Sequence, residues 1–231
     1  MLVAMEAKQV QFTDEEQAEI DKFVAEFGYS INAIYQCDLA WFVQTGSVAV
    51  TKYLVAMGSD IDARGYESGY TRLHCAANRG NVELVKYLIS EGANVHAKSW
   101  GHGMTPLHFA DNIEVAQCLV SKGAKVNAKD RHGRTPLFEK VYSTDIDIVK
   151  YLVSEGAKVN VLDNYDNTPL DVAKEYGKEN TTIIEYLESV DAKPGKWRLY
   201  QRAINVGRRI RDALSEKLQW VKYVKRRYFK V

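Results

Sequence analysis

Residues 92–110 read GANVHAKSWGHGMTPLHFA, and variants of this phrase occur three more times in the chain. The other copies are GSDIDARGYESGYTRLH at residues 58–74, GAKVNAKDRHGRTPL at 123–137 and GAKVNVLDNYDNTPL at 156–170. The threonines of successive copies are 34, 30 and 33 residues apart. A self-similar segment that returns at such a period is the sequence signature of stacked helical repeats.

Each copy resembles the signature of the ankyrin repeat family, in which a turn leads into T-P-L-H-x-A and then into two helices. Four linked copies make the resemblance specific, and it covers residues 37–190. It implies an all-α ankyrin-repeat solenoid of about five repeats, each a β-hairpin followed by a helix-turn-helix, with an atypical first and last repeat. We expect an N-terminal helical cap at residues 1–36, the array at 37–190, and a basic amphipathic C-terminal helical extension at 191–231.

The residues of the phrase have structural roles. Threonine caps the inner helix of each repeat, and proline takes a first-turn position where no backbone donor is needed. The resemblance implies that the histidine side chain bonds backbone across repeats, so His74 and His108 are expected to be structural rather than ligands. Gly92, Gly123 and Gly156 fit the left-handed position that ends a helix.

The N-terminal region contains a helix signal of its own. Residues 13–16, TDEE, have the form of a capping box, in which a threonine and a glutamate satisfy each other's backbone donors. The pattern predicts a helix over residues 14–27. We expect Phe23, Val24 and Phe27 to face inward and cover the first repeat, because the end of a solenoid needs a cap.

Three departures from the phrase distinguish this array. Arg72 stands where proline is usual. The repeat that begins at Thr105 lacks about three residues between its helices, nearly one helical turn, which predicts a notch in the array. The repeat that begins at Thr135 has Phe-Glu-Lys at residues 138–140 in place of His-x-Ala, which puts charge on an inner helix.

The composition indicates an intracellular, core-forming protein. Apolar residues make up 46% of the chain and charged residues 26%, and no apolar run is long enough to span a membrane. The first residues lack the basic and apolar regions of a secretory signal. Cys37, Cys75 and Cys118 form an odd set without CxxC spacing, which favours a reducing compartment. We therefore expect a cytoplasmic location, with a nuclear or host-cell location left open.

The charge is distributed unevenly along the chain. Residues 193–231 contain 13 lysines and arginines and two acidic residues, a net charge of +11, so the remaining residues carry −10. An apolar stripe at helical spacing runs along this basic tail. Basic and aromatic residues occupy other positions of the tail and are candidates for binding an anionic surface: Arg198, Arg202, Arg208, Arg209, Trp220, Tyr223, Arg226 and Arg227.

The basic tail has three interpretations. Its apolar stripe could pack on Ile183, Ile184 and Leu187 as a C-terminal cap, because an apolar face must be covered. Its basic face could bind nucleic acid, with Trp220 or Tyr223 stacked on bases. The helix could also dock on an anionic membrane or into the groove of a partner.

The resemblance also indicates where a partner would bind. Ankyrin arrays bind partners with their hairpin tips and with the exposed face of their inner helices. Side chains at these positions are not needed for packing between repeats. The tips in this chain are residues 64–70, 98–104, 129–134 and 162–167. Aromatic and arginine side chains usually carry interface energy, although some of these aromatics could only brace neighbouring hairpins. The predicted partner-binding residues are Tyr66, Tyr70, Asn78, Arg79, Trp100, His102, Met104, Arg131 and Arg134.

The chain contains no HExxH, P-loop or GxSxG motif, so no catalytic residues and no cofactor are expected. His96, His102 and His132 could meet a metal only if neighbouring hairpins converged, and we expect no metal site. The expected function is non-catalytic recognition of a protein partner, as an adaptor, inhibitor or effector, without a small-molecule substrate. The competing class is binding of nucleic acid or an anionic membrane through the basic tail.

Overall fold

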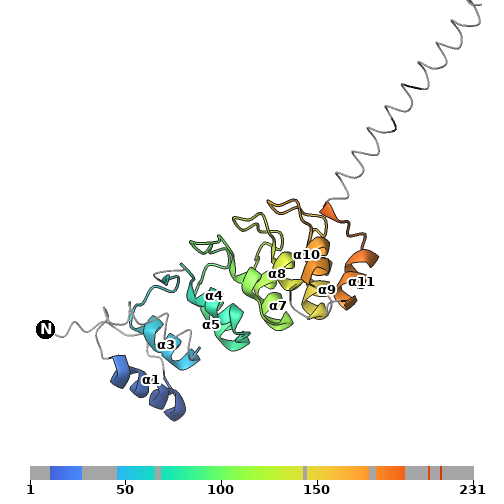
Figure 1. Ribbon diagram of the computed structural model, residues 1–231. Coiled ribbons are helices and arrows are strands. Elements are labelled where there is room, and N and C mark those ends of the chain that lie inside the picture. The colour runs from blue at the N-terminus through green and yellow to red at the C-terminus, as the bar shows by residue number, and fades with distance from the viewer. Residues whose placement is uncertain are drawn as a thin grey trace, which may run out of the picture.

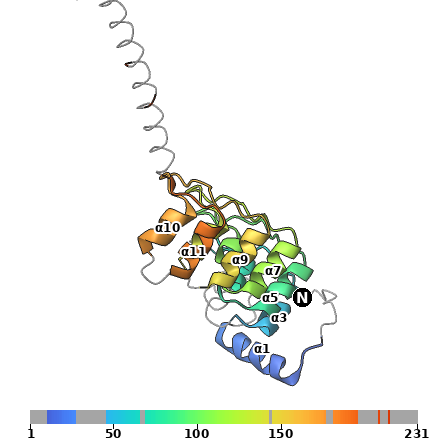
Figure 2. The ribbon, with the colours of Figure 1, turned by 90° about the vertical axis from the view of Figure 1, so that its right-hand side faces the viewer.

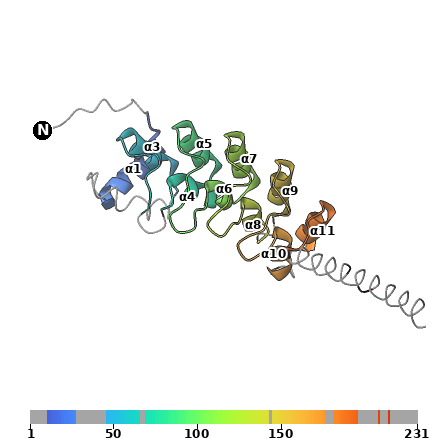
Figure 3. The same ribbon diagram turned by 90° about the horizontal axis from the view of Figure 1, so that it is seen from above.

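The computed structural model describes residues 11–27, 46–65, 69–142, 145–176 and 181–195, together with Arg208 and Leu214. Helices lie in two rows, which are seen side by side from above (Figure 3). The inner row contains α4 (Arg72–Asn78), α6 (Pro106–Phe109), α8 (Pro136–Lys140) and α10 (Pro169–Tyr176). The outer row contains α3 (Val48–Ala56), α5 (Val82–Ser90), α7 (Ile113–Ser121), α9 (Ile146–Ser154) and α11 (Thr181–Ser189).

Like helices stack on one another and build one continuous core. In the inner row α4 packs on α6, α6 on α8 and α8 on α10, and the outer helices stack in the same order from α3 to α11. The hairpin tips all project to one side of the stack (Figure 1). The predicted all-α repeat solenoid is confirmed. Its core contains the leucine of every phrase, each at most 1% exposed: Leu73, Leu107, Leu137 and Leu170.

Helix α1 (Asp14–Phe27) covers the N-terminal end of the stack, where it packs against α3 (Figure 2). The predicted capping box is present, because the Thr13 N–H donates to Glu16 Oε2 (3.0 Å) and the Glu16 N–H donates to Thr13 Oγ1 (3.2 Å). Glu16 also pairs with Lys52 of α3, with 2.8 Å between Nζ and Oε1. The start of α1 is therefore fixed both locally and against α3.

The inward face of α1 is apolar, as the sequence predicted. Phe23 is 1% exposed and forms a small cluster with Val50 and Leu54 of α3. Val24 packs against the same cluster. The side chain of Phe27, which was expected to join them, lies outside the described part of the chain.

His74 links its own repeat to the next one. The Thr71 N–H donates to His74 Nδ1 (3.1 Å), and the Thr71 hydroxyl lies 2.8 Å from the same nitrogen. Because Nδ1 accepts, the proton of the neutral ring is on Nε2, which donates to the Met104 carbonyl (3.0 Å). The structural role expected for His74 is confirmed.

His108 repeats this arrangement one unit further along. Its Nδ1 accepts from the Thr105 N–H (3.0 Å), and its Nε2 donates to the Arg134 carbonyl (3.3 Å). Burial lowers the pKa of both His74 and His108 to about 4, because a charged imidazole would lose its hydration. Both side chains are thus neutral at pH 7. A neutral ring is required for Nδ1 to accept a hydrogen bond while Nε2 donates one.

The third and fourth phrases replace this histidine, and each does so differently. Phe138 is fully buried, and the buried hydroxyl of Thr135 has no hydrogen-bond partner among the described residues. In the last repeat Asp171 Oδ2 accepts from both the Thr168 N–H (2.9 Å) and the Thr168 hydroxyl (2.8 Å). An aspartate can therefore cap its own helix, whereas a phenylalanine leaves the threonine hydroxyl unsatisfied.

Two charged residues of the inner helices are buried. Arg72, in the place of proline, is 1% exposed and donates from Nη1 to the Asp60 carbonyl (2.7 Å) and from Nη2 to Ser59 Oγ (2.6 Å). It ties α4 to the loop that precedes it. Lys140 is 8% exposed, and burial lowers its pKa. The charge expected on α8 at this position is therefore directed into the stack rather than to the surface.

The array ends on a segment that takes the place of a further repeat. The Lys193 N–H donates to Asn160 Oδ1 (2.7 Å), just as the Lys158 N–H donates to Asn127 Oδ1 (2.8 Å) one repeat earlier. The N–H of Gly195, a buried residue, donates to the Asp171 carboxylate. Residues up to 195 therefore complete the last repeat structurally.

Of the basic tail beyond Gly195, the structure describes Arg208 and Leu214. Both are helical and exposed, and Leu214 is 55% exposed. The packing of the apolar stripe as a cap is therefore not seen at Leu214, while Ile183 and Leu187 are buried in the stack. The other tail residues named above lie outside the described part, so their role stays a prediction.

The unsatisfied hydroxyl gives a first prediction. Thr105→Val should lower the free energy of unfolding by about 1 kcal/mol, because it removes a hydroxyl that lies 2.9 Å from His108 Nδ1. Thr135→Val should cause no loss, because the hydroxyl it removes is buried without a described partner. Urea unfolding of both variants measures the difference, and equal losses would contradict the assignment.

The lowered histidine pKa values give a second prediction. Because the folded pKa of about 4 lies below that of an exposed histidine, the unfolded chain binds more protons below about pH 6.5. Stability should be complete above that pH and fall by about 1.4 kcal/mol per pH unit for each histidine as the pH decreases toward 4. His108→Gln should flatten this dependence in urea titrations at several pH values. His96→Gln, at an exposed position, is the control and should leave the slope unchanged.

Candidate functional site

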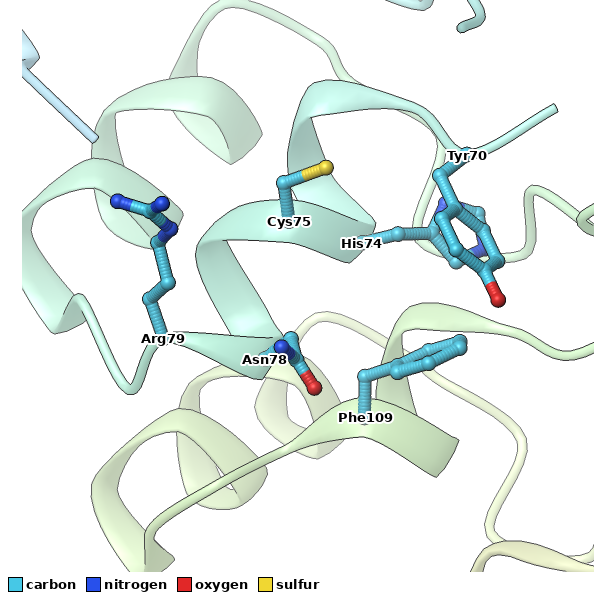
Figure 4. Close-up of a pocket in the computed structure, with 6 residues that line it drawn as sticks. All are labelled: Tyr70, His74, Cys75, Asn78, Arg79 and Phe109. Carbon is cyan, nitrogen blue, oxygen red and sulfur yellow. The ribbon is translucent and has the colours of Figure 1, made fainter. Parts of the chain in front are cut away.

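A pocket of about 160 Å³ opens between α4 and α6 on the inner row (Figure 4). Tyr70, His74 and Phe109 gather at one end of it and Arg79 lies at the other, with Asn78 between them (Figure 4). Cys75 supplies a further wall. Tyr70, Asn78 and Arg79 were predicted as binding residues, so the structure brings these three together at one pocket.

The irregular length of the inner helices explains why the pocket is there. Helix α4 has seven residues, whereas α6 has four and ends at Phe109. The notch predicted from the missing residues is confirmed. Asn78 and Arg79, at the end of α4, are exposed as a result. The chain after α6 returns directly to α4, because the Asp111 N–H donates to the Ala77 carbonyl (3.1 Å).

The aromatic walls of the pocket hold each other in place. The rings of Tyr70 and Phe109 meet edge to face with centroids 5.0 Å apart, and the rings of His74 and Phe109 lie 5.8 Å apart. Edge-to-face contact at this distance is the geometry that aromatic pairs prefer. Since His74 is itself fixed by Thr71 and the Met104 carbonyl, the walls are preformed.

Phe109 lines the pocket but was not among the binding residues predicted from the sequence. It occupies the x of T-P-L-H-x-A, and its side chain is half-buried. The same position is taken by Cys75, Glu139 and Val172 in the other repeats. Because Cys75 and Val172 are buried there, the position alone gave no signal that Phe109 would line a pocket.

The open face of the inner row becomes polar beyond the pocket. Burial raises the pKa of the Glu139 carboxyl, which the nearby Arg134 guanidinium partly opposes. Arg134 donates from Nε to Asp163 Oδ2 (3.3 Å) and from Nη1 to the Tyr142 hydroxyl (3.3 Å). Arg134, predicted to contact a partner, therefore binds within the array.

Neighbouring tips are joined by long basic side chains. Arg64 Nη1 donates to the Lys98 carbonyl (2.6 Å), Lys98 Nζ to the Lys129 carbonyl (3.0 Å), and Lys129 Nζ to the Leu162 carbonyl (3.3 Å). Each tip thus fixes the backbone of the next. These bonds make the tips rigid. They also occupy charged groups that, from the sequence alone, would be expected to be free.

The predicted tip residues have mixed surroundings. Arg131 Nη1 donates to the Gly101 carbonyl (3.1 Å), and its backbone N–H donates to the His102 carbonyl (2.8 Å). Trp100 is 50% exposed, but its ring lies directly against Gly69, where no side chain would fit. Both residues therefore contact neighbouring hairpins, and their contact with a partner stays a prediction. Met104 is half-buried, and Tyr66 lies outside the described residues.

Two histidines of adjacent tips do converge. The imidazoles of His102 and His132 have ring centroids 5.7 Å apart, tilted by 36°. No cluster of three or more histidine, cysteine or carboxylate ligands occurs in the described part of the chain. The pair contributes to the packing of the tips, and we assign no metal to it.

Comparison with known proteins agrees with the repeat phrase. A family model described as ankyrin repeats (3 copies) matches residues 39–130 and 111–196, which together make up more than half of the chain. A search of curated proteins gave no match. Among the described helices, none has both the length and the apolar character that a membrane span requires.

The bracing role of Trp100 can be tested by stability. Trp100→Ala should lower the free energy of unfolding by about 1 kcal/mol, because half of a large ring is buried against the tip of Gly69. Tyr165→Ala is the matched control, since this aromatic tip residue is 65% exposed, and it should cause little change. Urea unfolding measures both, and equal effects would contradict the bracing role.

Proposed function

Because the chain belongs to the ankyrin repeat family, whose arrays are generally protein–protein interaction modules, we propose that it recognises a protein partner as an adaptor, inhibitor or effector. The partner would contact the open face of the inner helices together with the adjacent tips. Arrays of this family are typically non-catalytic. We propose the same for this chain, and an intracellular site of action.

The observation that carries this proposal is the preformed aromatic pocket on the inner row. Aromatic side chains that line a fixed concavity are the usual centres of interface energy. Tyr70 and Phe109 are held edge to face and His74 is fixed by two repeats, so binding requires little reordering of the protein. Low ordering entropy leaves more of the contact energy available as affinity.

The tips support the proposal in a second way. The hydrogen bonds from Arg64, Lys98 and Lys129 to neighbouring carbonyls make them a rigid edge beside the pocket. Tyr70, Asn78 and Arg79 of the predicted patch line the pocket, which supports the proposal that they contact the partner directly. Trp100 and Met104 would contribute their exposed parts.

The second candidate function belongs to the basic tail. Residues 193–231 carry a net charge of +11, and Arg208 and Leu214 are exposed. A basic segment of this kind could bind nucleic acid or an anionic membrane. It would act in addition to the array or in place of it.

Affinity capture separates the two candidates. The chain should be truncated after Gly195, because Lys193 and Gly195 donate to groups of the array. We expect the truncated chain to retain its protein partner, and Phe109→Ala in the full chain to weaken binding of the purified partner by tenfold or more, an effect typical of hot spots. Lys86→Glu, an exposed substitution on α5, is the control and should change affinity little.

One combination of results would contradict the proposal. Truncation that abolishes all binding while Phe109→Ala has no effect would assign the function to the basic tail. A salt-dependent loss of nucleic-acid or vesicle binding on truncation would then identify which surface the tail recognises. Thermal unfolding of each variant shows that the array has remained folded.

A further inference from the structure

The size of the pocket restricts what can enter it. Its volume of about 160 Å³ is close to that of an apolar cavity of about 150 Å³, in another protein, that binds benzene. A single six-membered ring therefore fits. The occupant is one side chain rather than a helix or a strand.

The walls favour a ring over a branched aliphatic group. Tyr70 and Phe109 already meet edge to face, and a third ring placed between the Phe109 ring and Cys75 would extend the same geometry. Cys75 is 7% exposed and brings a polarisable sulfur to the wall, a favourable neighbour for an aromatic ring. His74 adds no charge at pH 7, because burial lowers its pKa to about 4.

The side chains that line the pocket include one cation, Arg79. Arg79 is the residue that follows α4, and it is exposed without an ion pair among the described residues. Arg79 lines one end of the pocket, and its guanidinium also lies beside Gly46 of the preceding repeat (Figure 4). Asn78, also exposed, adds an amide next to it. A carboxylate is the group that such an arginine pairs with most strongly.

We infer that the pocket binds a phenylalanine side chain of the partner, and that Arg79 pairs with an aspartate or glutamate next to that phenylalanine in the partner's sequence. This inference rests on the proposed function and specifies the chemistry of the segment recognised. The ring supplies the buried contact, and the carboxylate sets the direction in which the segment crosses the inner row. The partner therefore presents a short acidic-aromatic segment.

The test uses the full chain and three acetylated, amidated hexapeptides. Their central residues are Glu-Phe, Lys-Phe and Glu-Ala, flanked by glycine, so that charge and ring vary one at a time. Titrations are followed by NMR at physiological salt, where long-range attraction to the basic tail is screened. The reporting signals are those of Tyr70, Phe109 and Cys75, which line the pocket. The variants are Arg79→Glu and, as a matched charge reversal outside the pocket, Lys86→Glu.

We expect the Glu-Phe peptide to bind the unmodified chain about tenfold more tightly than either other peptide, which corresponds to 1.4 kcal/mol. Arg79→Glu should reverse the order, so that the Lys-Phe peptide binds best. Lys86→Glu should leave the original order intact. Because Arg79 is exposed, its replacement should not unfold the chain.

Three outcomes would overturn the inference. Equal affinity of the Glu-Phe and Glu-Ala peptides would show that no ring enters the pocket. An acid preference that survives Arg79→Glu would locate the charge recognition in the basic tail. Peptide binding that leaves the signals of Tyr70 and Phe109 unchanged would place the contact elsewhere. If a protein partner is still captured and lost on Phe109→Ala, the proposed function stands although this inference fails.

Discussion

A neutral imidazole shared between two repeats is the contact on which the stack depends. His74 and His108 each accept from the threonine that begins their helix and donate to a carbonyl of the next repeat. Only an uncharged ring can do both, because one nitrogen must lack a proton while the other carries it. These bonds fix the distance between successive tips and inner helices. Where the histidine is missing, Phe138 fills the space with apolar surface and Asp171 caps its own helix instead.

The binding features arise where this regular stack is interrupted. Helix α6 ends at Phe109 and is shorter than α4, so Asn78 and Arg79 at the end of α4 stay exposed and a pocket opens there. The open face then changes from aromatic at Phe109 to carboxylate at Glu139 one repeat later. A partner segment that crosses this face meets a different chemistry at each step. A partner bound as proposed would therefore be recognised by its direction as well as by its shape.

The fold could be predicted from the sequence because each repeat uses short-range signals. These signals are the threonine that begins each inner helix, the leucine that follows it and the capping box at Thr13. Each of them depends on residues only a few positions away in the sequence. The site was predicted less completely, because its residues depend on contacts between repeats. Arg131 and Arg134 read as free cations, but their long side chains reach carbonyl and carboxylate groups of neighbouring tips. Phe109 was missed because nothing in the local pattern shows which ring is left uncovered.

The end of the array is closed by the chain itself. Asn160 Oδ1 and the Asp171 carboxylate accept from the backbone of Lys193 and Gly195, which stand where a following repeat would begin. A solenoid whose last unit left these acceptors and its apolar flank open would offer a template to the first unit of another molecule, and copies could join head to tail into filaments. Because Lys193 and Gly195 already occupy these acceptors, they are not open to a second molecule. The end of the array is thereby closed without any change to the repeat itself.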